Sequence, residues 1–394
     1  MATVKVKFCP PALAGSRGTV YYQVIHERRV RRIASGCRLM ASEWCGGCVA
    51  VAEVSERIRC DLQRLWAIVG RLDARGWSYS ADDVVAEYER CRRECLLPVF
   101  MESVIASLAC DGKVRTAETY RSTLSSFGRF LREARGASAD DFMLDSITPE
   151  LLKDYERWLH AAGLVPNTVS FYNRILRAVY NRAAERGLIE NRHPFGRVYT
   201  GVDKTAKRAL PLPVLRRIKA LDLSHTPALE YSRDMFMLSF YLRGMSFIDM
   251  AFLRKSDLCD GYVAYRRRKT GRRLVIRWTQ EMQAIVDKYP ENASCYLLPV
   301  IRTRGINERC RYRNVGYNIN HNLKKIAAMV GVAAPLTLYV ARHSWASAAQ
   351  AKGVPVGVIS EGMGHTSEAT TRIYLSSLDS SVVDSANSLI MSSL

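Results

Sequence analysis

The sequence Gly362-Met-Gly-His365-Thr-Ser-Glu-Ala-Thr-Thr-Arg-Ile-Tyr374 places a histidine nine residues before a tyrosine, close to the C-terminal end of the chain. Gly364 suits a tight bend, and Ser367 is a residue type that commonly begins a helix. The pattern predicts a loop followed by a helix over residues 367–375 that carries Tyr374 near its far end. Because a single histidine or tyrosine is most often structural, the interpretation depends on residues farther upstream.

Two upstream segments add to this pattern: Tyr339-Val-Ala-Arg342-His343-Ser-Trp345, and Lys269-Thr270 in a basic stretch. Together with the first segment they resemble the C-terminal signature of the tyrosine recombinase, or phage integrase, family. That signature has an H-x-x-R-H helix start, then L-G-H, then a tyrosine nine residues after that histidine. Arg342-His343, Met363-Gly-His365 and Thr370-Thr-Arg-Ile-Tyr374 match it in order and at the family's spacing.

The charge of the chain favours a polyanionic partner. Its 394 residues include 58 Lys and Arg against 38 Asp and Glu, for a formal net charge of +20. A balance this basic indicates nucleic acid first and a membrane surface second. No run of about 18 apolar residues is present, so no membrane span is expected. The first residues, Met1–Lys7, are strand-like and have no secretory apolar core.

The eleven cysteines are scattered over a chain too long to need disulfide bonds for its stability. We therefore expect reduced thiols in a cytoplasmic protein. Cys45-Gly-Gly-Cys48 is the only C-x-x-C in the sequence, and no second cysteine or histidine pair follows at zinc-finger spacing. The sequence therefore predicts no metal site, and it gives no sign of a cofactor.

Residues 1–50 predict a small basic β-sheet domain, with strands over 4–8, 19–26 and 31–37 and turns at residues such as Gly36. Integrases that bind accessory arm sites have an N-terminal sheet domain of this kind. A cluster of basic residues is the candidate DNA-binding surface, and a solvated surface without a partner is the alternative. The cluster consists of Arg28, Arg29, Arg31 and Arg32. Residues 51–98 predict a helical coupler with two helices, over 51–75 and 81–95.

Residues 99–195 predict an all-helical domain of four helices, the last capped by Asn167. This pattern resembles the SAM-like core-binding domain of the family. Polar residues on these helices are candidates for DNA contact, although each alone is more often a plain surface or core residue. The candidates are Arg121, Asn173, Arg174 and Arg177. Residues 196–210 have little periodicity and predict a linker.

Residues 211–394 predict an α+β domain that resembles the family's catalytic domain. It is expected to contain one β-hairpin, over 262–278, whose turn holds Lys269. The remaining elements are expected to be helices over 213–221, 232–243, 246–253, 279–289, 317–330, 337–351, 356–363 and 367–375. The whole chain is therefore expected to be mainly α with small β elements.

The resemblance implies a role for each matching residue. Tyr374 would be the nucleophile and form a 3′-phosphotyrosyl bond, which stores the energy of the broken bond and removes any need for ATP or a metal. Arg342 would grip the phosphate with parallel donors, as guanidinium groups do. His365 would bind the phosphate or help the proton of the tyrosine to leave. Lys269 would be the acid for the leaving oxygen, and His343 would support Arg342.

Two positions depart from the family pattern. Tyr339 stands where the family has its first histidine; its hydroxyl can donate to a phosphate oxygen but cannot act as a base near neutral pH. Ser246 stands where the family has its first arginine, in Gly244-Met-Ser246-Phe-Ile-Asp249. Ser246 and Asp249 also match a capping box, so a structural role is the alternative. Our hypothesis is that Arg243, just before the glycine, reaches the same phosphate.

The sequence thus predicts a site-specific DNA recombinase that clamps double-stranded DNA between residues 99–195 and 211–394. The family resemblance implies a homo-tetramer on DNA, a C-terminal tail that docks on a neighbouring protomer, and a place for an accessory DNA-bending protein. Docking of the tail on its own domain is the alternative. A type IB topoisomerase-like enzyme and a DNA-binding protein with a degenerate site are the competing functions. Integration, excision and inversion all remain open as outcomes.

Overall fold

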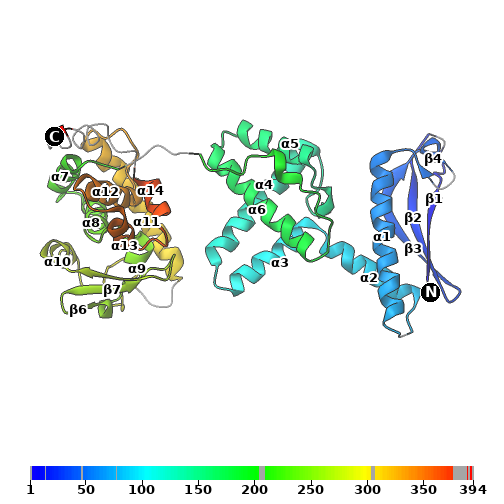
Figure 1. Ribbon diagram of the computed structural model, residues 1–394, viewed down its shortest axis with the longest axis horizontal. Coiled ribbons are helices and arrows are strands. Elements are labelled where there is room, and N and C mark those ends of the chain that lie inside the picture. The colour runs from blue at the N-terminus through cyan, green and yellow to red at the C-terminus, as the bar shows by residue number, and fades with distance from the viewer. Residues whose placement is uncertain are drawn as a thin grey trace. The chain divides into compact units, whose positions relative to one another are not determined.

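A computed structural model describes residues 2–13, 15–45, 48–76, 78–203, 209–302, 307–375, 388 and 391–392. They fall in two compact units, Met1–Lys204 and Thr205–Leu394 (Figure 1). The predicted fold class is confirmed, because the described residues are mainly helical with small antiparallel sheets. The turn of the C-x-x-C segment, at 46–47, and residues 376–387 of the C-terminal tail lie outside the described residues.

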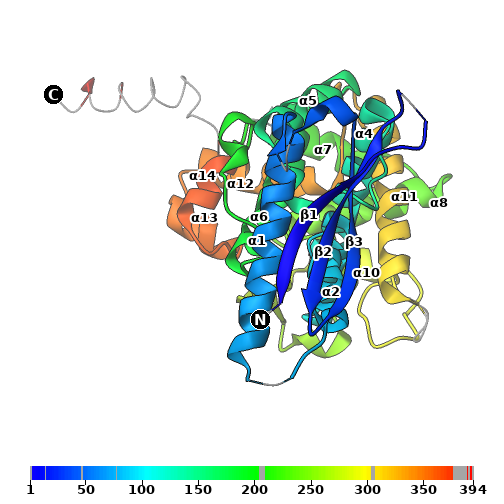
Figure 2. The same ribbon diagram turned by 90° about the vertical axis from the view of Figure 1, so that its right-hand side faces the viewer.

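The N-terminal residues form an antiparallel sheet in the order β1-β2-β3, with bounds Thr3–Cys9, Gly18–His26 and Arg29–Leu39. Alternate side chains of β2 are buried against α1 (Ala52–Ala74) and α2 (Ala81–Glu94). Figures 1 and 2 show α1 lying along the sheet. This alternation leaves the other face of the sheet polar, as in a small sheet with one solvated side.

The strand predicted over 31–37 was expected to end near Gly36, and that expectation is wrong. Gly36 lies inside β3 with φ of 75°, and the pairing with β2 shifts register between Thr19 and Tyr21. Across this shift β3 has two more residues than β2, and they form a bulge in which glycine tolerates the positive φ. A short two-stranded sheet of β4 (Trp44–Cys45) and β5 (Cys48–Val49) follows.

The core-binding helices are α3 (Leu97–Cys110), α4 (Val114–Arg135), α5 (Pro149–Ala161) and α6 (Pro166–Glu185). Thr148 caps α5 by accepting a hydrogen bond from the backbone N–H of Leu151 at 3.2 Å. Asn167 does not cap α6, contrary to expectation, because Pro166 already occupies the first position of the helix. Instead, its side chain donates to the backbone oxygen of Asp203 at 3.0 Å and accepts from the N–H of Asp203 at 2.8 Å.

Polar contacts join the N-terminal part of this unit to the core-binding helices. Arg64 on α1 pairs with Asp145 at 2.6 Å, and Arg192, beyond α6, pairs with Glu56 on α1 at 3.0 Å. Because Arg64 is largely buried, its pair is screened less by salt than an exposed pair.

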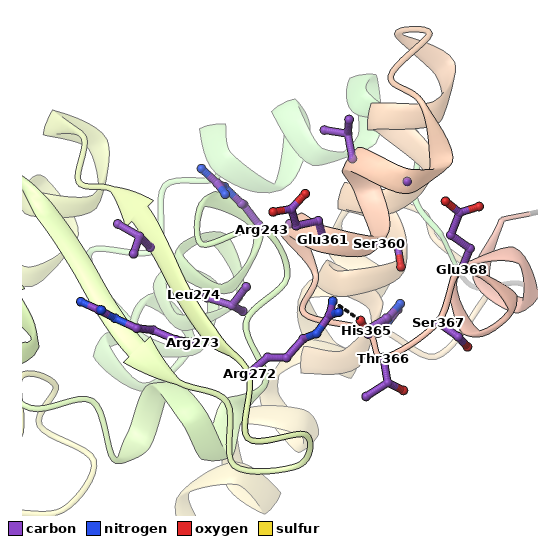
Figure 3. A pocket seen from close by; sticks show the side chains of 14 residues that line it. Arg243, Arg272, Arg273, Leu274, Ser360, Glu361, His365, Thr366, Ser367 and Glu368 are labelled. Carbon is purple, nitrogen blue, oxygen red and sulfur yellow. Dashed lines mark hydrogen bonds between the residues drawn. The ribbon is translucent and has the colours of Figure 1, made fainter.

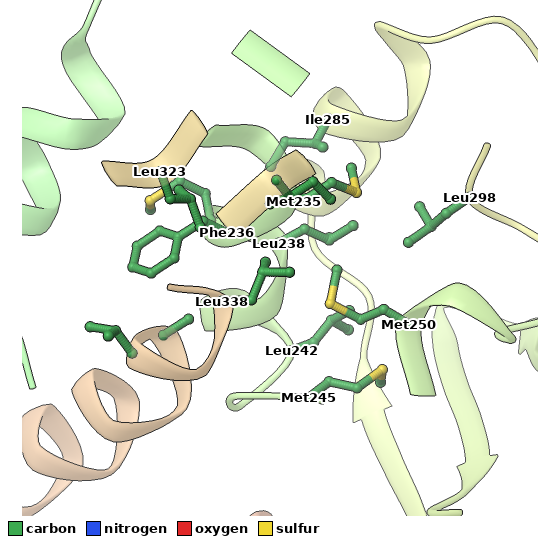
Figure 4. Close-up of a cluster of buried hydrophobic side chains, with 14 of the residues drawn as sticks. Met235, Phe236, Leu238, Leu242, Met245, Met250, Ile285, Leu298, Leu323 and Leu338 are labelled. Atoms are coloured by element: carbon green, nitrogen blue, oxygen red, sulfur yellow. The ribbon is translucent and has the colours of Figure 1, made fainter. Parts of the chain in front are cut away.

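The C-terminal unit is built around α8 (Pro227–Tyr241), which is buried on most of its sides. Figure 4 shows Phe236 and Leu238 of α8 packed with Leu323 and Leu338 from two other helices. The unit also contains a three-stranded sheet of β6 (Leu258–Cys259), β7 (Tyr262–Arg266) and β8 (Arg273–Arg277). The other helices are α7 (Leu212–Ala220), α9 (Phe247–Ala251), α10 (Gln280–Asp287), α11 (Glu308–Met329), α12 (Leu338–Ala351), α13 (Val356–Gly362) and α14 (Glu368–Tyr374).

Helix α11 begins at Glu308, although the sequence pattern predicted a helix only from residue 317. Asn307 caps it by accepting a hydrogen bond from the backbone N–H of Cys310 at 3.1 Å. The first turns are polar and basic and bury little, so hydrophobic periodicity could not detect them. None of the described helices is both long and apolar enough to cross a bilayer.

Candidate active site

Arg342 lies on α12 and is only 3% exposed. Its Nη1 donates to the backbone oxygen of Gly244 at 2.7 Å, and its Nη2 donates to that of Met363 at 2.6 Å. The guanidinium is thus held by two backbone segments, the one after α8 and the one after α13. A fixed guanidinium of this kind can present its donors to an anion without first losing side-chain entropy.

Gly244 is the backbone position that lets Arg342 come close. A Cβ added there would lie 2.6 Å from the Cα of Arg342, and the φ of Gly244 is 71°. The residue must therefore be glycine for two separate reasons, its conformation and the lack of space.

We expect Gly244→Ala to lower the free energy of unfolding by about 3 kcal/mol, since a left-handed alanine and an overpacked site both cost energy. Gly331→Ala is the matched control, because Gly331 has φ of 69° but no atom within 4 Å of its added Cβ. It should cost about 1 kcal/mol. Denaturant unfolding of both variants measures the difference, and equal losses would contradict the close approach to Arg342.

His365 is 3% exposed and lies against Arg342. Its Nε2 is 2.9 Å from Nη2 of Arg342, and its Nδ1 is 2.7 Å from Oγ1 of Thr371. Burial, followed by the positive charges of Arg342, Arg267 and Lys269, lowers the pKa of His365 to about 4. His365 is therefore neutral at physiological pH in the absence of DNA.

This lowered pKa predicts a pH dependence of stability. Between pH 6.5 and about 4, His365 is protonated in the unfolded chain but not in the folded chain. The free energy of unfolding therefore decreases as the pH is lowered through this range. Above pH 6.5 the histidine has no effect on it. Each unit of pKa corresponds to about 1.4 kcal/mol. When the free energy of unfolding is measured with denaturant at several pH values in this range, it should fall more steeply with decreasing pH for the wild type than for His365→Gln.

The exposed His321 supplies the control for this comparison. His321→Gln should show the same pH dependence of the free energy of unfolding as the wild type, because the variant and the wild type have the same carboxylates and the same buried His365. Identical slopes for the wild type and His365→Gln would show that folding does not shift the pKa of His365.

The β7–β8 hairpin holds the loop that carries His365. Nη1 of Arg267 donates to the backbone oxygen of Gly364 at 2.7 Å, and Nη1 of Arg272 donates to that of His365 at 2.6 Å. Thr270 donates to the same Gly364 oxygen at 3.2 Å. Lys269, in the hairpin turn as expected, is exposed and close enough to lower the pKa of His365. The structure therefore brings Lys269, His365 and Arg342 together.

Arg243 occupies an unusual backbone position at the end of α8. The N–H of Gly244 bonds the oxygen of Ser239 at 2.8 Å, and that of Arg243 bonds the oxygen of Phe240 at 3.1 Å. These two bonds define a Schellman motif with Arg243 at its left-handed C′ position, which is usually glycine. Arg243 has φ of 58°, so an L-residue here carries a conformational cost.

Arg243 and His365 line one cavity of about 760 Å³, together with Arg272 and Glu361. Figure 3 shows that the guanidinium of Arg243 points away from His365, whereas that of Arg272 reaches the backbone of His365. Arg243 is therefore at the site, but a phosphate contact would need another rotamer of its side chain.

Ser246 begins α9 but does not form the expected capping box. Its hydroxyl donates to Oδ2 of Asp249 at 2.6 Å, and Oδ1 of Asp249 accepts from the N–H of Arg268 at 2.9 Å. Asp249 is thus occupied by the hairpin and the serine, and does not turn back to the backbone N–H of Ser246. Asp249, which Ser246 holds in place, links α9 to the hairpin that bears Lys269.

Tyr339 and His343 lie one turn apart on α12, with ring centroids 4.9 Å apart in an edge-to-face arrangement. Tyr339 is 51% exposed and lines a cavity of about 550 Å³ with Ser246 and Arg342. Tyr339 and Ser246, the two residues that depart from the family pattern, therefore line the 550 Å³ cavity, whereas Arg243 lines the 760 Å³ cavity with His365.

Tyr374 is the last residue of α14, as the sequence predicted, and its side chain lies outside the described part of the structure. Thr371, three residues earlier, is fully buried. Leu375, the next residue, is buried with Ala346 and Ile359 of the same unit. The backbone of Tyr374 is thus anchored on both sides to its own catalytic unit.

The N-terminal candidates for DNA contact are exposed, but two of them already have partners. Arg28 is in the turn between β2 and β3, and Arg29 begins β3. Arg31 pairs with Asp82 through two hydrogen bonds, at 2.5 and 3.0 Å, and Arg32 lies over the ring of Tyr21. Arg31 would have to leave Asp82 before it could neutralise a phosphate.

The candidates on the core-binding helices differ in accessibility. Arg121, Arg174 and Arg177 are exposed, and Arg177 donates to the hydroxyl of Thr200 at 3.2 Å. Asn173 is fully buried, and its Nδ2 donates to the backbone oxygen of Tyr199 at 3.1 Å. The interpretation of Asn173 as a DNA-contact residue is corrected, because its side chain holds the segment after α6 in place.

Sequence reasoning missed Arg267 and Thr371. Arg267 follows Val263 and Tyr265 on the buried face of the β7 line, so an arginine in phase with core residues was a usable signal. Thr371 had no such signal, because a buried threonine on a short helix looks like any other core-facing residue. Among the described residues, no group of three His, Cys, Asp or Glu is placed to hold a metal ion.

Two protein families match different parts of the chain. The phage integrase SAM-like domain matches residues 96–198, and the phage integrase family matches residues 219–381. Tyrosine recombinase XerA of Thermococcus kodakarensis is 25% identical over 261 residues, which cover 57% of this chain and 90% of that protein. Tyrosine recombinase XerD of Listeria monocytogenes is 26% identical over 231 residues, which cover 54% of this chain and 72% of that protein.

Solved structures share the same fold. A lambda integrase tetramer bound to a Holliday junction aligns with a TM-score of 0.54 and 16% identity, covering 93% of this chain and 97% of that one. The Tn1549 transposon integrase in complex with circular intermediate DNA aligns with a TM-score of 0.52 and 17% identity, covering 74% of this chain and 98% of that one.

The matching family and the named tyrosine recombinases define an enzyme that breaks and rejoins DNA. The chain belongs to the phage integrase family of tyrosine recombinases, and its function is site-specific DNA recombination. The family expected from the sequence is thereby confirmed.

Proposed function

We propose that this recombinase cuts duplex DNA through a 3′-phosphotyrosyl bond to Tyr374. The observation that carries the proposal is the joined pair of Arg342 and His365, 2.9 Å apart, whose histidine is bonded directly to the helix that ends in Tyr374. A phosphate bound at this pair would lie beside the tyrosine helix. Arg342, held in place by two backbone oxygens, would stabilise the charge that develops on the phosphate during the attack.

Attack, protonation of the leaving oxygen and deprotonation of the tyrosine are each assigned to one side chain. The hydroxyl oxygen of Tyr374 bonds to phosphorus while the bond from phosphorus to the 5′ oxygen breaks. Lys269 gives its proton to that leaving oxygen, as an exposed lysine on a hairpin turn can follow the DNA strand. His365 is neutral before DNA binds, and its Nε2 takes the proton of the tyrosine once the Arg342 N–H that it accepts has turned to the phosphate. Rejoining reverses these transfers, so no external energy source is needed.

The second guanidinium for the phosphate is assigned to Arg243. Arg267 is more deeply buried, and its Nη1 already holds the Gly364 loop at 2.7 Å. Arg243 is only half-buried, lines the cavity beside His365, and sits at a backbone position that disfavours any side chain. A side chain retained where glycine is preferred suggests a functional reason for it. Tyr339 faces the neighbouring cavity beside Arg342 and would reach the phosphate from that side, and His343 and Ser246 would support the site.

The assembly is proposed by analogy with the relatives. The lambda integrase structure is a tetramer on a Holliday junction, and we expect this chain to form a homo-tetramer that pairs two duplex sites. Arg28, Arg29 and Arg32 would bind DNA at the N-terminal sheet, and Arg121, Arg174 and Arg177 would bind it at the core-binding helices. The reaction would take place on cytoplasmic DNA, with an accessory DNA-bending protein as a further partner.

Two experiments on the wild-type protein test this function. Labelled duplexes from the DNA flanking its own gene should give a protein–DNA band that survives a denaturing gel. Two distinguishable duplexes carrying the same site should exchange strands. An adduct without exchange would favour the type IB topoisomerase-like reaction. A native-gel complex without any adduct would favour the degenerate-site alternative, for which Ser246 is the motivating observation.

A further inference from the structure

Thr371 closes a chain of hydrogen bonds that begins at Arg342. Nη2 of Arg342 lies 2.9 Å from Nε2 of His365, and Nδ1 of His365 lies 2.7 Å from Oγ1 of Thr371. All three side chains are at most 3% exposed. The chain joins α12 to α14 through the loop that carries His365.

The direction of these bonds follows from the chemistry of arginine. A guanidinium can only donate, so Nε2 of His365 must accept. A neutral imidazole that accepts at Nε2 carries its one proton on Nδ1, and this N–H therefore donates to Oγ1 of Thr371. The lowered pKa of His365 agrees with a neutral ring.

We propose that Thr371 is the positioning residue of the reaction: it accepts the Nδ1–H of His365 and so keeps the Nε2 lone pair directed at Arg342 and the phosphate site. The proposal rests on the proposed function of Tyr374 and His365. Thr371 does not touch the DNA itself, because it is fully buried. It acts through His365.

The same bond fixes the tyrosine helix. Thr371 lies three residues before Tyr374 on α14, a helix of only seven residues, and its backbone oxygen accepts from the N–H of Leu375 at 3.0 Å. Isolated helices of this length are unstable, so α14 depends on its packing contacts. One hydroxyl thus positions both the base and the element that carries the nucleophile.

Two variants separate the hydroxyl from the space it fills. Thr371→Val keeps the shape of the side chain but leaves the buried Nδ1–H without its acceptor. Thr371→Ser keeps the acceptor and loses a methyl group. We expect the valine variant to form the covalent adduct about ten- to a hundred-fold more slowly, by analogy with residues that hold the second nitrogen of a metal-bound histidine, and the serine variant to stay within a few-fold of the wild type.

The histidine ring supplies a readout that does not need DNA. In the full-length protein labelled with nitrogen-15 histidine, long-range proton–nitrogen spectra should show His365 protonated on Nδ1, with its signals assigned from their loss in His365→Gln. Thr371→Ser should leave the Nδ1–H proton shifted downfield by its hydrogen bond. Thr371→Val should keep the tautomer, which Arg342 sets, but its Nδ1–H signal should move upfield because the acceptor is gone.

Either of two results would overturn the proposal. One is a serine variant as slow as the valine variant, which would mean that the methyl group and not the hydroxyl matters. The other is a valine variant whose Nδ1–H signal is the same as in the wild type. Failure of the proposed function would look different, because the wild-type protein would then form no adduct while its tautomer still matched the expectation.

Discussion

Tyr374→Phe should form no covalent adduct with DNA and should still bind DNA. The change removes only the hydroxyl that attacks phosphorus, and no other group can supply the bond that survives a denaturing gel. The measurement is the labelled protein–DNA band of the wild type and the variant on a denaturing gel, beside a native gel that reports binding. The expected difference is complete, from a clear band to none.

Tyr262→Phe is the control for this loss. Tyr262 is 49% exposed on β7, in the same unit, and it carries no role in the proposed reaction. It should give the wild-type adduct. An adduct formed by Tyr374→Phe would mean that another residue is the nucleophile, and sequencing the peptide that remains attached to the DNA would identify it.

Arg243→Gly should slow cleavage by about a hundred- to a thousand-fold, the usual cost of removing one donor to a developing oxyanion. The same change should leave the free energy of unfolding unchanged or raise it by about 1 kcal/mol, because glycine is the preferred residue at the C′ position of a Schellman motif. Cleavage is measured by covalent capture, and stability by denaturant unfolding. Lost activity in a protein that is no less stable would assign the loss to the guanidinium.

Two other arginine variants complete this test. Arg254→Ala removes an exposed arginine of the same unit and should retain cleavage. Arg267→Gln tests the buried arginine that holds the Gly364 loop. Wild-type cleavage by Arg243→Gly, together with loss in a folded Arg267→Gln protein, would move the second phosphate contact to Arg267.

Much of the active site could be predicted because its signals are local in the sequence. Arg342 and His365 were identified from fixed spacings, and the structure places them 2.9 Å apart. The β-hairpin around Lys269 could be predicted from the alternation of apolar and polar residues in its strands and from its Thr270-Gly271 turn. The helix that ends in Tyr374 was bounded to within a residue.

Other features depend on contacts between distant segments. Asn173 looked like a DNA ligand on a polar helix face, but the segment after α6 covers it. The role of Thr371 is apparent only once α14 packs beside His365. The need for glycine at 244 is apparent only because Arg342 lies within 3 Å of the position that a Cβ would take there. No periodicity in a single stretch encodes such approaches.

The left-handed backbone at residue 243 also has an evolutionary consequence. Arginine and glycine codons can differ by a single base, so a more stable helix end is one mutation away. Natural chains sit only slightly above the stability that they need, and a stabilising change without a functional cost would readily be accepted. A descendant that had lost recombination would therefore be free to drift to glycine here, and an arginine at this position would mark a gene still selected to move DNA.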